Sequence, residues 1–136
     1  MCGIFGGYNI SNEEVIKGVE LIKRGNDGIS IDTVDENIIF GARRHAIKFC
    51  GNENNLLNRS DQPYYSDDKD VALIFNGEFY NFEDYKLKLK KDKILFKSEG
   101  DTEVLLKLYE KYGISFLRDK KIDSLYSIAI YDKKLK

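Results

Sequence analysis

Hydrophobic residues fall into short runs that predict strands and into longer segments with helical spacing. Strands are predicted over residues 3–10, 29–34, 38–47, 71–75, 78–80, 94–96 and 125–131. Helices are predicted to begin at Ser11, Asn81 and Asp101, residue types that cap helix N-termini, and to end near residues 24, 91 and 112. Because strands occur at the start, middle and end with helices between them, we expect an α+β fold with a mostly antiparallel sheet.

Each predicted helix has an apolar face that is expected to pack inward. In the first helix, Ser11 and Glu14 match the capping-box sequence. The lysines from Lys86 to Lys93 are expected to form the solvated face of the second helix. The expected buried residues are Val15, Ile16, Val19 and Ile22, then Phe82, Tyr85 and Leu89, then Val104, Leu105, Leu108 and Tyr112.

The dipeptide Asn76-Gly77 supports two interpretations. On pattern alone the favoured one is a hairpin turn that connects strand 71–75 to a return strand at 78–80. The other is an oxyanion hole, since an asparagine amide and a glycine N–H can stabilise a tetrahedral oxyanion. The polar segment over residues 50–70 is expected to be irregular.

Composition limits the class of protein. With 136 residues the chain suits one domain, and its net charge of −1 gives no reason to expect nucleic acid or an anionic membrane as partner. No apolar run reaches the ~18 residues of a transmembrane helix, and the start lacks a basic signal-peptide flank. We therefore expect a cytoplasmic protein, in which Cys2 and Cys50 form no disulfide framework. One histidine, His45, and two distant cysteines do not suggest a zinc site, so no metal is expected.

Cys2 follows the initiator methionine directly, in the sequence Met-Cys-Gly. A free cysteine is often simply packed in a core. If Met1 is removed, however, Cys2 carries both a thiol and an α-amine, whose reference pKa is about 7.7–8.0. One residue then supplies a nucleophile and its base without a histidine.

Other polar residues complete a candidate site. Arg43 and Arg44 occupy adjacent strand positions, so their side chains point to opposite faces. Either guanidinium can bind a carboxylate through two parallel N–H···O bonds, and position alone does not say which one does. Asp101 is expected to cap a helix, although a carboxylate there can also bind an ammonium group. A molecule with an α-carboxylate, an α-ammonium and an electrophilic side-chain carbonyl fits this set of groups, and glutamine is such a molecule.

Several motifs resemble class II glutamine amidotransferases of the N-terminal-nucleophile hydrolase type. The start, residues 1–6, resembles the start of that family, and Arg24-Gly25-Asn26-Asp27-Gly28 resembles its arginine-glycine-proline-aspartate-glycine loop. The asparagine synthetase branch in particular is similar to residues 75–81 (FNGEFYN) and 100–106 (GDTEVLL) and, more loosely, to residues 124–132. The motifs occur in family order along nearly the whole chain.

The resemblance implies a fold and a set of roles. The fold would be two stacked antiparallel sheets with flanking helices, incomplete at the C-terminus. Cys2 would attack the glutamine side-chain amide to form a thioester, with Asn76 and Gly77 as the oxyanion hole. Arg44 would hold the substrate carboxylate, and Glu78 and Asp101 the α-amine. The products would be glutamate and ammonia.

The expected partners follow from the same resemblance. Glutamine hydrolysis needs no cofactor, whereas ATP and magnesium would belong to a separate synthetase domain or subunit, which is absent from this chain. Asparagine synthesis by this chain alone is therefore not predicted, and a second copy of the chain is a further candidate partner. The rival hypothesis is a catalytically silent remnant that binds glutamine or another protein.

Overall fold

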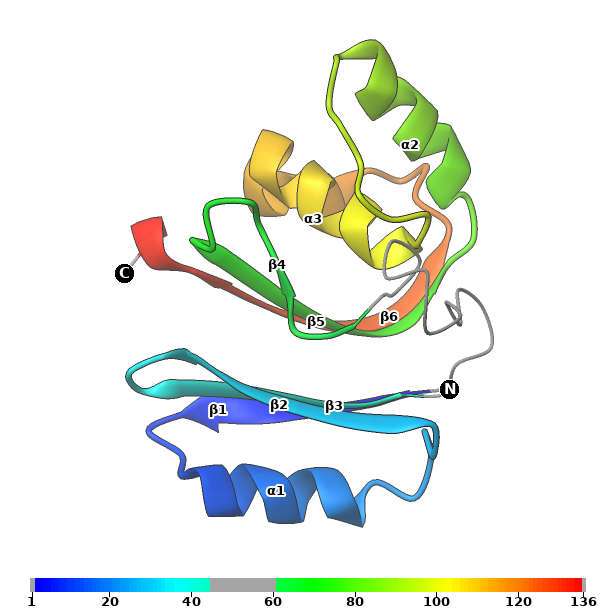
Figure 1. The fold of residues 1–136 in the computed structure, drawn as a ribbon. Helices are drawn as coiled ribbons and strands as arrows, with labels where there is room; N and C mark the ends of the chain where they lie inside the picture. The colour runs from blue at the N-terminus through cyan, green and yellow to red at the C-terminus, as the bar shows by residue number, and fades with distance from the viewer. Residues whose placement is uncertain (1, 45–60, 136) are drawn as a thin grey trace. The chain divides into compact units, whose positions relative to one another are not determined.

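The computed structural model describes residues 2–44 and 61–135. Contacts between Cα atoms divide the chain into two compact units, and Figure 1 shows its elements along the chain. Of the described residues, unit 1 contains 2–44, 61–76 and 127–135, and unit 2 contains 77–126. Strands β5 (Val71–Phe79) and β6 (Ser124–Asp132) pass from one unit into the other.

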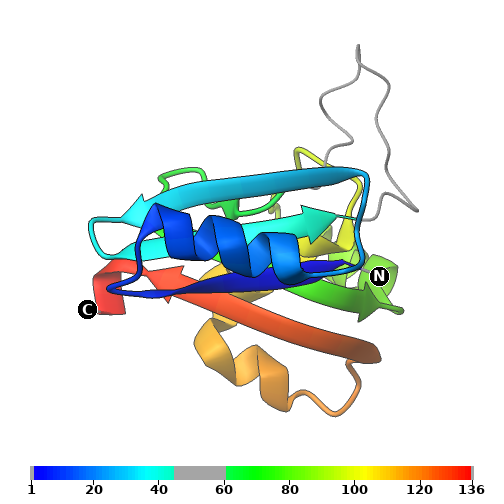
Figure 2. The same ribbon diagram turned by 90° about the horizontal axis from the view of Figure 1, so that it is seen from below.

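Unit 1 contains a three-stranded antiparallel sheet covered by a helix. The strands are β1 (Gly3–Tyr8), β2 (Gly28–Asp35) and β3 (Ile38–Arg44), in the order β1-β3-β2. Helix α1 (Asn12–Leu21) lies across one face of this sheet (Figures 1 and 2). The helix is amphipathic, and it buries Val15 and Val19 completely against Ile39 of β3.

The second sheet has the order β4-β5-β6, where β4 is the two-residue strand Tyr64–Tyr65. Within unit 1 the two sheets share one core. Val34 and Phe40 of the first sheet pack with Ala72, Ile74 and Tyr131 of the second. Burial of the larger apolar side chains among these, such as Val34, Phe40 and Ile74, stabilises the fold by about 1.5–3 kcal/mol each. A single 3₁₀ turn, η3 (Lys133–Leu135), follows β6.

Unit 2 is mostly helical. Helix α2 (Phe82–Lys91) contacts α3 (Asp101–Tyr112), and the 3₁₀ helix η2 (Gly113–Arg118) follows α3. Helix α3 is followed by Gly113, whose combination of φ 59° and ψ −160° is readily adopted only by glycine. Among the described residues, no helix has both the length and the apolar character needed to cross a membrane.

Most predicted elements are confirmed. The fold is α+β with two antiparallel sheets and helices, and the capping box of α1 is present, with Ser11 Oγ accepting from Glu14 N–H. The last strand and the ends of α2 and α3 agree with the prediction to within two residues. Strand β3 is described only as far as Arg44, so the predicted strand end at 47, His45 and Cys50 lie outside the described residues.

Other expectations about single elements are wrong. Residues 94–96 form no strand, while β4 and η2 were not predicted. The inward faces are also corrected: Ile16 and Tyr112 are exposed because they lie at the margins of their helical faces, and Phe82 and Ile22 are half-buried. Lys86, expected in solvent, is buried, because its ammonium group donates to partners in the 97–100 segment.

Candidate active site

The segment Asn76-Gly77-Glu78 is part of a continuous strand. Strand β5 runs without interruption from Val71 to Phe79, so the predicted hairpin turn and return strand are wrong. Gly77 is needed for a different reason, which is the close approach of β6. A Cβ atom at position 77 would lie 2.0 Å from the carbonyl oxygen of Leu125. The glycine therefore permits close packing of two strands, and its N–H belongs to a rigid element.

Cys2 and Arg44 leave the first sheet at the same end. In the antiparallel register Gly3 lies opposite Arg43, and Cys2 and Arg44 are the next residues in each strand direction. Cys2 is half-buried, directly before β1. Arg44 Nη1 lies 3.2 Å from Asp61 Oδ1, and its side chain is 23% exposed. The sheet register thus brings residues 2 and 44 to the same end of the first sheet in unit 1.

Arg43 has a structural role. Its guanidinium donates to the carbonyl oxygens of Glu20, Ile22 and Gly25 and to Asn26 Oδ1, at distances of 2.7–3.3 Å. These bonds fix the turn between α1 and β2. Because the two arginines point to opposite faces, this observation leaves Arg44 as the candidate for binding a carboxylate.

Gln62 connects this region to β5. Its side-chain amide accepts from Phe75 N–H at 2.7 Å and donates to Phe75 O at 2.9 Å, as a neighbouring strand would. Ser30 Oγ also donates to the backbone oxygen of Gln62. The Asp61-Gln62 dipeptide therefore contacts both Arg44 and the residue that precedes Asn76.

The acidic residues of the predicted site, Glu78 and Asp101, both lie in unit 2. The half-buried carboxylate of Asp101 accepts a hydrogen bond from Phe79 N–H at 3.2 Å. Burial raises the pKa of Asp101, the bond from Phe79 N–H opposes this, and the negative charge of Glu78 raises it again. Two carboxylates in one partly desolvated region favour a cationic ligand group such as an ammonium.

Two expected helix caps differ from the structure. Asp101 is the first residue of α3, and the N-cap position belongs to Gly100, which has no capping side chain. Asn81 occupies the N-cap position of α2, but its side chain bonds instead to Lys121 O and Asp123 N–H. Asp101 thus directs a carboxylate oxygen to Phe79 of β5, beside Glu78.

The site residues predicted from the sequence are divided between the two units. Cys2, Arg44 and Asn76 belong to unit 1, and Gly77, Glu78 and Asp101 belong to unit 2, with the Asn76–Gly77 peptide bond joining the groups inside β5. Asp61 and Gln62 were missed, because their only sequence signal is a polar dipeptide in a polar segment. Within the described part of the chain, no three His, Cys, Asp or Glu side chains gather as metal ligands do.

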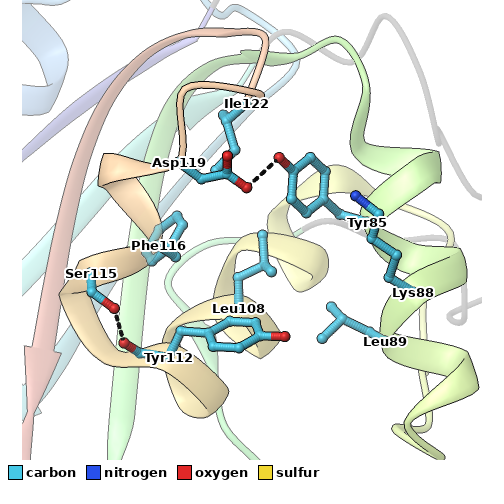
Figure 3. Close-up of a pocket in the computed structure, with 9 residues that line it drawn as sticks. All are labelled: Tyr85, Lys88, Leu89, Leu108, Tyr112, Ser115, Phe116, Asp119 and Ile122. Carbon is cyan, nitrogen blue, oxygen red and sulfur yellow. Dashed lines mark hydrogen bonds between the residues drawn. The ribbon is translucent and has the colours of Figure 1, made fainter.

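A cavity of about 270 Å³ lies within unit 2, between α2, α3 and η2 (Figure 3). Leu89, Leu108 and Phe116 contribute apolar surface to its wall. The Tyr85 hydroxyl donates to Asp119 at 2.8 Å, and Lys88 lies 4.6 Å from the centre of the Tyr85 ring. Burial and the Asp119 bond raise the pKa of Tyr85. Burial and the hydrogen bond between Tyr85 and Asp119 thus explain the raised pKa of Tyr85 without a bound ligand.

Comparison with known proteins places the chain in a family. The glutamine amidotransferase domain family matches residues 1–136. The chain is 33% identical to asparagine synthetase [glutamine-hydrolyzing] 2 of Bacillus subtilis, with 98% of this chain and 17% of that protein aligned. It is 40% identical to asparagine synthetase [glutamine-hydrolyzing] 2 of Oryza sativa subsp. japonica (98% and 22% aligned) and 30% identical to asparagine synthetase B [glutamine-hydrolyzing] of Escherichia coli (98% and 24%).

The chain therefore spans about a fifth of the length of these relatives. The family match, in contrast, extends from the first residue to the last. The resemblance inferred from residues 1–6, 75–81 and 100–106 is thereby confirmed, and the chain belongs to the glutamine amidotransferase domain family.

Proposed function

We propose that this chain hydrolyses the side-chain amide of glutamine to glutamate and ammonia. The observation that carries the proposal is the location of Cys2, half-buried directly before β1, in a domain matched to the family over residues 1–136. The relatives are named as glutamine-hydrolysing enzymes, which supports the same reaction here. In this proposal the fold is that of an N-terminal-nucleophile hydrolase.

The reaction begins when removal of Met1 frees the α-amine of Cys2. The sulfur attacks the amide carbon of glutamine, an S–C bond forms, and the carbonyl electron pair moves onto oxygen. The α-amine takes the thiol proton and delivers it to the amide nitrogen, so the C–N bond breaks and ammonia leaves. Water then attacks the thioester, the S–C bond breaks, glutamate leaves, and sulfur regains a proton.

Asn76 and Gly77 stabilise the oxyanion in this scheme. The side-chain amide of Asn76 and the N–H of Gly77 donate to the developing negative charge. One such donor is worth about 2.7–4 kcal/mol in a transition state. The continuous strand β5 supports this role, because donors on a paired strand need no reorganisation during the reaction.

Three charged residues bind the rest of the substrate in the proposal. Arg44 pairs with the α-carboxylate, and its position at the same end of the first sheet as Cys2 supports this. Glu78 and Asp101 take the α-ammonium. The partly desolvated Asp101 carboxylate supports this second role, since a cation relieves its repulsion with Glu78.

A separate synthetase domain or subunit is the proposed acceptor of the ammonia. The relatives are much longer than this chain, which leaves room in them for such a domain. Hydrolysis itself uses no cofactor in this proposal, and ATP with magnesium would act in the other domain. We place the reaction in the cytoplasm, with a homodimer as an alternative assembly.

Intact mass and ammonia release together test the function. The protein should lack Met1, gain one adduct from an electrophilic glutamine analogue, and release ammonia only when glutamine is present. Cys2→Ala should abolish both the adduct and the ammonia, whereas Cys50→Ala, the matched control, should retain them. A protein that binds glutamine with Met1 removed, but forms no adduct and releases no ammonia, would be the silent binding remnant.

A further inference from the structure

We propose that Glu103 is a positioning residue for glutamine binding. Through the segment of residues 97–100, Glu103 fixes Asp101, the carboxylate that takes the α-ammonium. This inference rests on the proposed function and adds to it a residue that never touches the substrate. All of its parts lie within unit 2.

Glu103 is a buried acid with an unusually complete set of donors. Its side chain is 2% exposed, although it lies on the first turn of α3. Lys97 N–H donates to Oε1 at 2.9 Å, and Ser98 donates to Oε2 through its N–H at 2.6 Å and its hydroxyl at 2.7 Å. A buried carboxylate needs such donors, because an unpaired one strongly destabilises a fold.

These bonds resemble a helix N-cap, except that the accepting side chain lies in the helix and the donating backbone N–H groups precede it. Gly100, at the N-cap position of α3, has no side chain to offer. Glu103 instead turns back toward the N-terminus and binds the chain that enters the helix at Lys97 and Ser98. Asp101 lies inside the ring of residues that these bonds close.

A second contact holds the same segment from the other side. Lys86 of α2 is 5% exposed, and its ammonium donates to Ser98 O at 2.9 Å and to Glu99 Oε2 at 2.7 Å. Gly100 N–H makes a longer contact of 3.4 Å with Ser98 Oγ. Ser98 is thus bound through its N–H, its hydroxyl and its carbonyl oxygen, and the entry to α3 is fixed between two helices.

The fixed segment matters because Asp101 makes one directional contact with the strand of the candidate site. Its Oδ2 lies 3.2 Å from Phe79 N, next to Glu78. A shift of the helix start by about 1 Å would break this bond, because hydrogen bonds weaken steeply beyond about 3.5 Å. Glu103 therefore determines where the carboxylate of Asp101 meets β5, and with it the position of the ammonium subsite.

The substitution Glu103→Gln tests the proposal. The glutamine side chain introduced at position 103 has the shape of the original glutamate. It places an NH₂ group against the N–H groups that in the wild type face a carboxylate oxygen. We expect the KM for glutamine to rise about tenfold, with little change in kcat, because a charge-assisted bond is lost and the binding subsite moves. Glu110→Gln, the same change on an outer position of α3, should leave KM unchanged and serves as the matched control.

A double-mutant cycle separates positioning from a general loss of stability. In the Asp101→Asn background, Glu103→Gln should raise KM no further, because its effect passes through Asp101. If the two increases in KM multiply instead, or if Glu103→Gln leaves KM at the wild-type value, the proposal is overturned. Ser98→Ala, a smaller change to the same network, takes the place of Glu103→Gln if that variant does not fold.

Hydrogen exchange decides the matter even if the wild-type chain releases no ammonia. That result would refute the proposed function alone. The amide of Phe79 should then exchange about tenfold faster in Glu103→Gln than in the wild type or in Glu110→Gln, because its acceptor Asp101 has moved. Faster exchange at Lys97 and Ser98 with unchanged exchange at Phe79 would show that Glu103 stabilises the loop without positioning Asp101.

Discussion

The substitution Gly77→Ala is the sharpest test of how the candidate oxyanion hole is built. A Cβ atom at this position would lie 2.0 Å from Leu125 O and 2.8 Å from Tyr126 Cα. Since Cβ atoms essentially never approach other atoms within 3.0 Å, the gap must open by at least 3.0 − 2.0 = 1.0 Å. Both obstacles are backbone atoms, so no side-chain rotation can relieve the clash.

The magnitude follows from that displacement. Overpacking of this kind destabilises a protein by about 1–3 kcal/mol. A donor moved by 1 Å also loses its hydrogen bond to the oxyanion, and loss of one such donor lowers kcat by about 10²–10³-fold. We therefore expect a folded protein with a modest loss of stability and a much larger loss of ammonia release.

The assay compares two alanine variants by urea unfolding and by glutamine-dependent ammonia release. Gly113→Ala is the control, because position 113 has open space around it but a φ of 59° and ψ of −160°. That backbone conformation disfavours alanine by about 1–3 kcal/mol, a loss of stability similar to that expected at position 77. If both variants keep full activity, or both lose it in proportion to their stability, the role assigned to the Gly77 N–H is wrong.

Three further predictions concern charged residues. Folding raises the pKa of Asp101, so its ionised form destabilises the native state at neutral pH, and this effect disappears as the pH falls below the ordinary pKa of 3.8. Asp101→Asn should therefore raise the midpoint of urea unfolding at pH 7 but not at pH 3. The same substitution should raise the KM for glutamine. Equal shifts of the midpoint at both pH values would contradict the argument that burial destabilises the ionised carboxylate. Arg43→Ala should lower the free energy of unfolding by about 2 kcal/mol, because its carbonyl partners lose a charged donor. Arg44→Lys should change stability little and raise KM, because lysine lacks the planar fork; the reverse pattern would exchange the roles of the two arginines.

The sequence predicted best those features that depend on neighbouring residues. The Ser11–Glu14 capping box is one example, because its two hydrogen bonds join residues three apart. The glycine that ends α3 is another. The candidate nucleophile also rests on a local signal, the position of Cys2 in the chain, and its role stays a prediction.

Features that depend on distant residues were predicted poorly. Asn76-Gly77 has strong local turn propensity, yet pairing with β6, some 45 residues later, keeps β5 extended through it. Lys86 is one lysine among several on α2, and only its partners at positions 98 and 99 account for its burial. Arg43 and Arg44 were left undecided for the same reason, because the turn that holds Arg43 is invisible in the strand pattern.

The way in which Gln62 bonds to Phe75 has a consequence for aggregation. Strand β4, at the edge of its sheet, covers β5 with only two residues, and beyond it one side-chain amide pairs with both polar backbone groups of Phe75. A long, flat edge strand would offer a second molecule a row of unpaired N–H and C=O groups. Among the described residues, the strand that forms this edge is two residues long and is followed by a side-chain contact, so β4 itself offers an incoming strand few backbone groups, and we expect it to be a poor template for fibril growth.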